Sequence, residues 1–156
     1  MIRPARPEDA EAIAAIWNQV IRETTQTFNT VEKRPALLAD QIGAQPFFVA
    51  DEGGTVQGFV TWSQFRPGTG YAHTVEHSVY VAPSGRGRGL GRALMAMAED
   101  RGRATGLHSM IAGVAGENTG GAAFHTALGY REIARLPEVG WKFGRWHDLV
   151  LMQKML

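Results

Sequence analysis

A glycine-rich basic segment between a predicted strand and a predicted helix is the feature that most constrains how this chain can fold. The segment Arg86–Gly91 reads Arg-Gly-Arg-Gly-Leu-Gly. It follows Thr74–Val81, a run of β-branched and aromatic residues that predicts a strand. It precedes Ala93–Arg103, a predicted helix closed by Gly106. The sequence therefore predicts a strand, a tight loop and a helix in direct succession.

Alternating glycines let backbone amides approach an anion closely, because no Cβ intervenes. The start of the following helix adds unpaired N–H groups and a partial positive charge, and Arg86, Arg88 and Arg92 add full charges. The segment lacks the Gly-Lys-Ser/Thr of a Walker loop, and its third glycine comes one residue too early for a dinucleotide fingerprint. The loop alone is equally consistent with a phosphate site and with a flexible basic turn.

The rest of the pattern predicts strands and helices in mixed order. Ile13, Ile16 and Trp17 recur at helical spacing after an acidic turn at Pro7, and Gly53–Gly54 between two apolar runs predicts a hairpin. We expect strands over Met1–Ala5, Phe47–Ala50, Val56–Trp62, Thr74–Val81, Met110–Val114, after Gly129 and over Leu149–Met155, and helices from Pro7 through Ile21 and over Pro35–Ala44, Ala93–Arg103 and Gly121–Leu128. Because a hairpin precedes most helices, the fold class is α+β rather than doubly wound.

Composition excludes several classes of protein. The 156 residues suit one domain spanning 1–156, and a net charge of +1 offers no field for nucleic acid or an anionic membrane. The absence of cysteine excludes disulfides, thiolate zinc sites and a cysteine nucleophile. No signal peptide begins the chain, and no apolar run approaches the roughly 20 residues that span a bilayer. We therefore expect a cytoplasmic protein.

Two spaced motifs resemble those of GNAT acetyltransferases. The Arg-x-x-Gly-x-Gly loop, preceded by Ser78–Pro83, resembles their pyrophosphate motif, and Asn118 leading through Phe124-His125 to Leu128–Tyr130 resembles their second cofactor motif. Within that superfamily, Thr74–Val81 and Gly140–Asp148 resemble the branch of phosphinothricin and methionine sulfoximine acetyltransferases. The resemblance covers nearly the whole chain.

The resemblance implies a GNAT fold, in which a mixed central sheet with one splayed pair of strands is flanked by helices. It implies acetyl-CoA as co-substrate and no metal. The backbone of Val79, Tyr80 and Val81 would bind the pantetheine arm, and Asn118 would contact the cofactor beyond the thioester. The pyrophosphate would be held by Arg86, Gly87, Arg88, Gly89, Leu90, Gly91 and Arg92. Gly120–Gly121 departs from the family pattern, and two glycines weaken a helix start, which puts that part of the cofactor contact in doubt.

Glu76 and His125 are the catalytic residues that the resemblance implies. Glu76 stands where this branch has its catalytic carboxylate and would accept the proton of the substrate ammonium, directly or through water. The alternative, a surface Glu in an ion pair, suits this apolar strand less well. His125 stands where many family members have a tyrosine that protonates the leaving thiolate, and the phosphinothricin branch also has histidine there. An imidazolium near pKa ~6.5 is a stronger acid than a phenol near ~10, but a packing histidine is an equal alternative.

The residues His73–His77 also match His-x-x-Glu-His, a metalloprotease pattern. That pattern requires a helix, so that the two histidines share one face. On a strand they would lie roughly 13 Å apart, too far to bind one zinc ion. We therefore reject a metal site here.

Substrate-binding residues are less well defined by the sequence. Arg66 lies in a loop that resembles a substrate loop of this branch, and an arginine suits the carboxylate of an amino-acid-like substrate. The other candidates are Phe28 and Tyr71 as an aromatic wall, His77, Ser78 and Lys142. The loop Lys142–His147 could complete the pocket, in the same chain or across the homodimer that the resemblance implies.

Together these features predict an enzyme that moves the acetyl group of acetyl-CoA directly to the primary amine of a small amino-acid-like molecule. Phosphinothricin and methionine sulfoximine are the substrate types that the resemblance implies. Two alternatives stay open: a protein N-terminal acetyltransferase, which needs an open peptide groove, and a non-catalytic CoA-binding module, in which Glu76 and His125 would lie far from the thioester.

Overall fold

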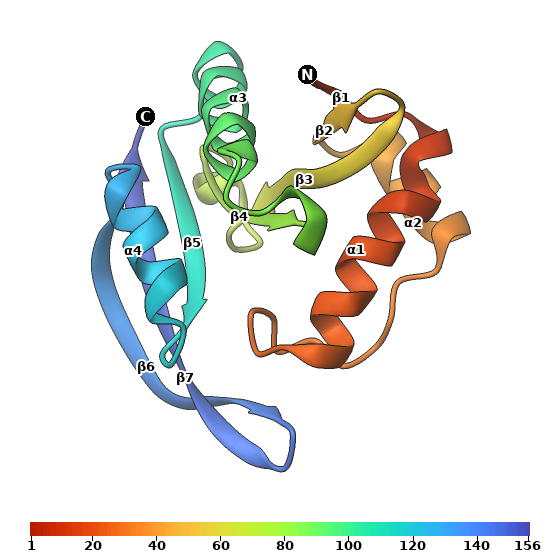
Figure 1. Ribbon diagram of the computed structural model, residues 1–156. Helices are drawn as coiled ribbons and strands as arrows, with labels where there is room; N and C mark the ends of the chain where they lie inside the picture. Colours follow the sequence, from red (N-terminus) through yellow and green to blue (C-terminus); the bar gives the residue numbers. More distant parts are fainter.

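A mixed sheet of seven strands runs through the computed structural model, which describes all of residues 1–156 (Figure 1). The spatial order of the strands is β1-β2-β3-β4-β5-β7-β6. The strands are β1 (Ile2–Pro4), β2 (Phe47–Glu52), β3 (Thr55–Gln64), β4 (Thr74–Val81), β5 (Ser109–Ala115), β6 (Arg131–Lys142) and β7 (Arg145–Met155). Only β4 and β5 are parallel neighbours; every other pair is antiparallel. The predicted α+β class is confirmed.

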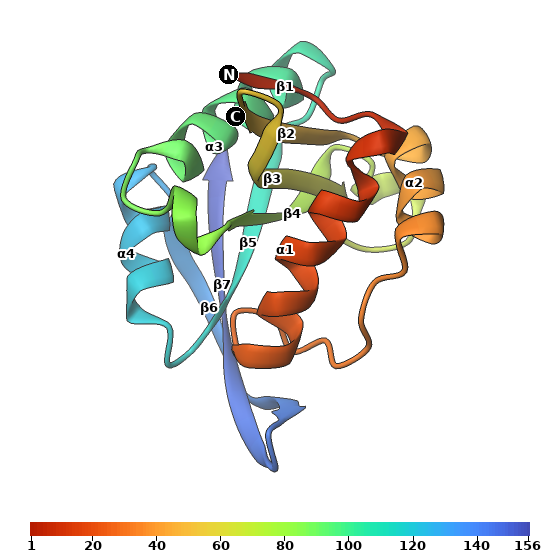
Figure 2. The same cartoon turned by 45° about the vertical axis from the view of Figure 1, so that its right-hand side comes forward.

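Four α-helices cover the two faces of the sheet (Figure 2). They are α1 (Ala10–Glu23), α2 (Pro35–Ala44), α3 (Leu90–Ala104) and α4 (Thr119–Ala127). The apolar stripe of α1 packs with Leu38 of α2 on one face, whereas Leu94 and Met95 of α3 pack on the other. Strand residues alternate between these two cores, as the two-residue period of a strand requires: Phe47 and Phe59 join the first, Phe48 and Val60 the second. None of the helices is long and apolar enough to span a bilayer.

The parallel pairing of β4 with β5 stops halfway along both strands. Register pairs join the strands from Thr74–Ser109 to His77–Ala112 and no further. Beyond that point β4 continues to Val81 against β3, and β5 continues to Ala115 against β7. The central sheet is therefore open between Ser78–Val81 and Gly113–Ala115, which is the splayed strand pair that the resemblance implies.

Two differences from the sequence prediction concern the glycine loop and the C-terminal hairpin. Helix α3 begins at Leu90 rather than Ala93, because Gly89, with φ +78°, occupies its N-cap in the left-handed region and Leu90–Arg92 form the first turn. The unpaired amides of the first turn of α3 are thus those of residues in the glycine-rich segment, from Leu90 onward. The stretch Lys142–His147, expected as a loop, is instead the end of the β6–β7 hairpin, which turns at Phe143 and Gly144.

The β6–β7 hairpin extends beyond the edge of the sheet at its turn (Figures 1 and 2). Phe143 and Gly144 both have positive φ, +54° and +71°, which matches the twist of a two-residue hairpin turn. The side chains of Trp141, Phe143 and Trp146 are exposed there, and the two indole rings pack edge to face with their centroids 4.9 Å apart. The hairpin end is therefore an aromatic surface.

Candidate active site

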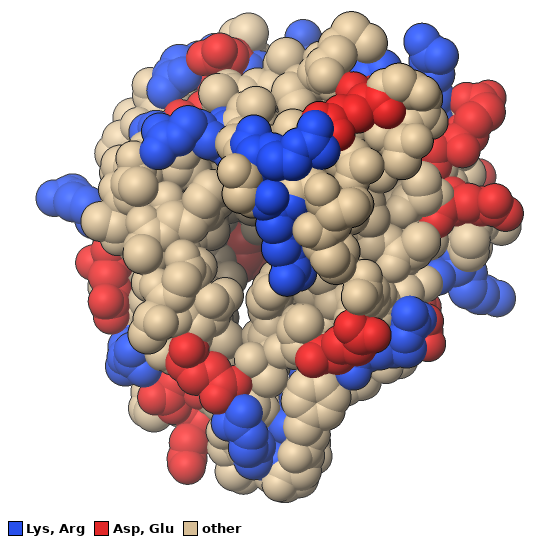
Figure 3. All heavy atoms as spheres, in the orientation of Figure 1, with Lys and Arg blue, Asp and Glu red and all other residues tan.

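A cavity of about 610 Å³ lies where β4 and β5 separate. A deep hollow is visible on this face of the molecule, with basic side chains gathered above it beside the start of α3 (Figure 3). The walls come from β4, β5, the starts of α3 and α4, and the loop between α1 and α2. The lining residues are Gln26, Thr27, Asn29, Glu76, His77, Ser78, Val79, Tyr80, Val81, Arg86, Gly91, Ala112, Gly113, Val114, Asn118, Gly120, Gly121, Phe124, His125 and Leu149.

The end of the cavity beside α3 suits an anion. Arg86 and Gly91 line it, and the helix directs its unpaired first-turn amides toward the loop. A Cβ on Gly87 or Gly89 would meet no protein atom within 4 Å, so both backbones are open to a ligand. Arg88 instead forms an ion pair with Glu52 at 2.6 Å, which offsets its charge. Two of the predicted phosphate-binding residues, Arg86 and Gly91, therefore line the cavity. The others do not: Gly87, Arg88, Gly89, Leu90 and Arg92.

Asn118 lines the cavity as the N-cap of α4. Its side-chain oxygen accepts a hydrogen bond from the Gly121 amide at 2.9 Å. A Cβ on Gly121 would lie 2.5 Å from the Asn118 amide nitrogen. Gly121 is expected from the sequence to weaken the start of this helix. Instead, the capping side chain of Asn118 leaves room only for a glycine at that position.

Glu76 is a half-buried carboxyl group without a hydrogen-bond partner among the protein side chains. It lies against β5: a Cβ on Gly113 would be 3.3 Å from its Oε1. Burial raises the pKa of Glu76 above its ordinary value. A partner-free carboxylate with a raised pKa is suited to accept a proton from a bound molecule.

His77 and His125 form a buried pair at the cavity. Their Nε2 atoms lie 3.0 Å apart, and the side chains are 6% and 8% exposed. Burial lowers the pKa of His77 to about 3 and lowers the pKa of His125 as well. Both rings are therefore neutral at neutral pH, so the resting His125 is not the imidazolium acid that the sequence suggests. Its part in catalysis stays a prediction.

The two histidines of the His-x-x-Glu-His pattern have different partners. The Nδ1 of His73 lies 3.0 Å from the carbonyl oxygen of Gly106, outside the cavity, whereas His77 faces His125. The segment from Thr74 is a strand, as the sequence predicts.

Neither ring of the predicted aromatic wall, Phe28 and Tyr71, lines the cavity of this chain, and their substrate role stays a prediction. Phe28 packs on the β6–β7 hairpin, where its ring stacks on His147 with centroids 5.4 Å apart and leaves no space for a Cβ on Gly140. Tyr71 is exposed, and the Arg66 guanidinium lies 5.4 Å from its ring centroid. Arg66 lies in a loop, as expected, but it does not line the cavity of this chain.

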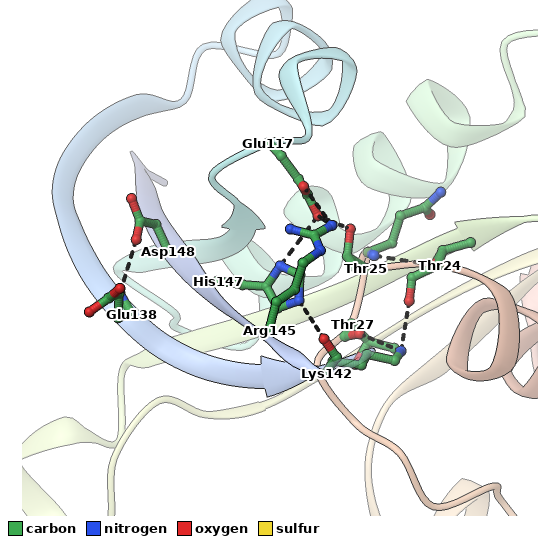
Figure 4. A network of polar contacts seen from close by, with 10 residues as sticks. Thr24, Thr25, Thr27, Glu117, Glu138, Lys142, Arg145, His147 and Asp148 are labelled. Atoms are coloured by element: carbon green, nitrogen blue, oxygen red, sulfur yellow. Dashed lines mark hydrogen bonds and ion pairs between the residues drawn. The ribbon is translucent and has the colours of Figure 1, made fainter.

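Lys142 holds a wall of the cavity instead of presenting its charge to it. The side chain is 3% exposed, and its Nζ donates to the carbonyl oxygens of Thr24 and Thr27 at 2.7 and 2.8 Å (Figure 4). Burial lowers the pKa of Lys142, and the two carbonyls take up its donors. The side chain therefore fixes the loop that contributes Thr27 to the cavity, and the substrate role of its ammonium stays a prediction.

Glu117 connects the same loop to the hairpin from the other side. Its carboxylate accepts from the hydroxyl of Thr25 at 2.7 Å and from Arg145 at 2.9 Å, and these hydrogen bonds lower its pKa (Figure 4). His147 lies 3.3 Å from the same carboxylate and donates from Nε2 to the carbonyl of Lys142. Because Asn118 follows Glu117, the network joins two walls of the cavity, the loop after α1 and the start of α4, to the β6–β7 hairpin.

The sequence prediction missed the loop residues Gln26, Thr27 and Asn29 and the ring of Phe124. Phe124 lies in the second cofactor motif, which implies no role for its ring. The only signal for the loop is its run of polar residues after the apolar stripe of α1 ends. A run of that kind is typical of any surface loop, so it could not identify a cavity wall.

Comparison with known proteins identifies a family. The model of the acetyltransferase (GNAT) family matches residues 13–130. The chain is 40% identical to an L-amino acid N-acyltransferase, MnaT, of Escherichia coli (strain K12), over 99% of this chain and 93% of that protein. It is 39% identical to an L-methionine sulfoximine/L-methionine sulfone acetyltransferase of Salmonella typhimurium, over 99% and 94%.

The fold has a counterpart that was solved with its co-substrate. A phosphinothricin acetyltransferase from Sinorhizobium meliloti in complex with acetyl-CoA superposes with a TM-score of 0.94 at 33% identity, covering 100% of this chain and 88% of that chain.

Replacing Lys142 tests the wall that it holds. In Lys142→Met the side chain keeps its length but leaves the carbonyls of Thr24 and Thr27 without their donor. We expect the free energy of unfolding to fall by about 1–3 kcal/mol. Amide hydrogen exchange over residues 24–29 should accelerate, as measured by mass spectrometry.

The control is Lys154→Met, which removes an ion pair with Glu99 far from this loop. It should lower stability without accelerating exchange over residues 24–29. Equal exchange of that loop in the parent and in Lys142→Met would mean that Lys142 does not hold it.

Proposed function

The chain belongs to the acetyltransferase (GNAT) family, and from that premise we propose that it transfers the acetyl group of acetyl-CoA to the primary amine of a small amino-acid-like substrate. Methionine sulfoximine and phosphinothricin are the proposed substrate types, because two similar proteins are named as their acetyltransferases. The observation that carries the proposal is the open end of the β4–β5 pair, where an unpartnered Glu76 faces a cavity beside a helix N-terminus.

The residues present fit acetyl-CoA. The donor supplies an activated acetyl group on a thioester. The strand backbone of Val79–Val81 has no sheet partner on its open side and would hold the pantetheine arm. The first turn of α3, with Arg86, would hold the phosphates. Asn118 lies at the wall formed by α4.

Glu76 would prepare the amine for attack. An amino group bound at pH 7 is largely an ammonium, which has no lone pair until it loses a proton. The carboxylate of Glu76, ionised and without a competing partner, accepts that proton directly or through water. The amine then forms the amide bond as the thiol leaves, and the absence of cysteine excludes an acyl-cysteine intermediate.

The acceptor end of the cavity contains His77 and Ser78 next to Glu76, together with the loop residues Gln26 and Asn29. These polar groups would orient the substrate. Arg66 remains a proposed partner for the substrate carboxylate, as the sequence suggests, and its position outside the cavity of one chain makes that role depend on a second subunit.

A panel of amines tests the function. Release of free thiol from acetyl-CoA is followed with methionine sulfoximine, phosphinothricin, the common L-amino acids and a peptide with a free N-terminal alanine. We expect the first two to give the highest kcat/KM. A preference for the peptide would establish a protein N-terminal acetyltransferase, and cofactor binding in calorimetry without turnover of any amine would establish a CoA-binding module.

Glu76→Gln tests the base. The amide keeps the shape of the side chain but cannot accept the proton, so we expect kcat to fall by about 10²–10⁴-fold with little change in acetyl-CoA affinity. Since burial raises the pKa of Glu76, the activity of the parent should be lost as the pH falls through that raised pKa. The variant should lack this part of the pH dependence.

The matched control is Glu132→Gln on an exposed position of β6, which should change neither quantity. Near-parental kcat in Glu76→Gln would make Glu76 a binding or structural carboxylate.

A homodimer and a cytoplasmic location complete the proposal. The exposed aromatic side chains of Trp141, Phe143 and Trp146 support a hairpin end that packs on a second copy of the chain, because such rings commonly anchor interfaces. No observation of the structure bears on the cellular location, which stays a prediction from the sequence.

Phe143→Asn tests the dimer. Asparagine suits the φ of +54° at this position better than phenylalanine, so the turn should survive while the ring is lost. We expect the dimer dissociation constant, from light scattering over a range of concentrations, to rise at least about tenfold. Ile133→Asn removes an exposed apolar side chain elsewhere on β6 and should have no such effect. A monomeric parent at every concentration would overturn the proposal.

A further inference from the structure

The contact between His77 and His125 has no task in the chemistry derived so far. One ring comes from β4 and the other from α4, so the pair bridges the two sides of the open sheet. The Nε2 atoms are 3.0 Å apart, and the Nδ1 of His125 lies 2.8 Å from the carbonyl oxygen of Gly121. The Nδ1 of His77 is buried and has no partner.

These contacts determine where the protons lie. A carbonyl oxygen can only accept, so the Nδ1 of His125 must carry a hydrogen and donate it to Gly121. In a neutral ring the Nε2 of His125 then carries a lone pair and no hydrogen. The Nε2 of His77 supplies the hydrogen between the two rings. The Nδ1 of His77 therefore carries a lone pair and no hydrogen. Burying such an acceptor without a hydrogen-bond partner costs less free energy than burying an unpaired N–H group.

The surroundings of the pair favour this neutral arrangement. The phenol ring of Tyr130 packs edge-on against both imidazoles, with centroids 5.6 and 5.3 Å away, and the ring of Phe124 packs against His125 at 5.1 Å. Glu76, next to His77 on β4, is the nearest carboxyl along the chain, and neither ring forms an ion pair with it or with any other residue. A proton added to the Nε2 of His125 would set two N–H groups against each other.

We propose that His77 is a positioning residue: its Nε2–H occupies the Nε2 lone pair of His125 and so locks that ring in the neutral form, whose Nδ1 proton binds the Gly121 carbonyl. His125 then has no free proton to give and no free lone pair to receive one. Glu76 is thereby left as the one side chain at this end of the cavity whose ionisation limits acetyl transfer. The last consequence rests on the proposed acetyltransferase function, whereas the lock does not.

The lock is measured directly by NMR of protein labelled with ¹⁵N-histidine. The parent at neutral pH should show His125 with a protonated Nδ1 and a bare Nε2, and His77 with the reverse. In His77→Phe the partner N–H is gone while the ring volume is kept. We expect the Nε2 of His125 to titrate at least about one pH unit higher than in the parent. The pH profile of kcat/KM should gain a second ionisation.

His77→Gln is the matched variant, because its amide nitrogen can reach the position of the imidazole Nε2 and donate to His125. It should restore the parental titration of the His125 Nε2 and a profile with one ionisation. A merely structural role for His77 would predict the same His125 titration in all three proteins.

Two results would overturn the proposal: an Nε2–H tautomer of His125 in the parent, or a His77→Phe protein with unchanged His125 titration. If His77→Phe does not fold, the parent spectrum and the Gln variant decide the question. If no amine is acetylated, the proposed function fails while the NMR measurement still tests the lock.

Discussion

The structure depends on the early end of one parallel strand pair. A parallel ladder normally continues as long as both strands do, since each added residue gains backbone hydrogen bonds. Here β4 and β5 stop pairing after His77 and Ala112, although each keeps its other neighbour to the end. The backbone groups released by this separation, the helix that starts beside it and the side chains on its inner surfaces make up the centre of the candidate site. The sheet loses a few hydrogen bonds at its centre and gains a cleft there.

Burial favours the uncharged form of the carboxyl group of Glu76 and of both imidazoles in this cleft. It raises the pKa of Glu76 and lowers the pKa values of His77 and His125, so desolvation disfavours charge on all three. Arg86 lines the end of the cavity beside α3, whereas the Glu117–Arg145 pair lies outside the cavity lining. The desolvation that raises the pKa of Glu76 also makes its carboxylate a stronger base toward a bound ammonium.

Sequence patterns predicted the elements well and their contacts poorly. The positions of most strands and helices follow from local periodicity, whereas the splayed pair and the grouping of Glu76, His125 and Asn118 follow from the resemblance to GNAT acetyltransferases. The start of α3 was missed by three residues, because glycines argue against a helix unless a neighbouring site uses their backbone. The tasks of Lys142 and Phe28 could not be predicted: both depend on which carbonyls and rings the tertiary fold brings to them, and neither side-chain type indicates a partner.

The bonds from Lys142 to Thr24 and Thr27 also bear on the order of folding. They join residues 118 and 115 positions apart, among the largest sequence separations of any hydrogen bond in the chain. Closing a loop of that size costs entropy that only a nearly complete fold can offset. The central sheet and its hairpins can form before this contact, whereas the wall of the cavity assembles only when the C-terminal hairpin meets the segment after α1. In a chain made from the N-terminus onward, the acceptor end of the site is therefore among the last parts to become native.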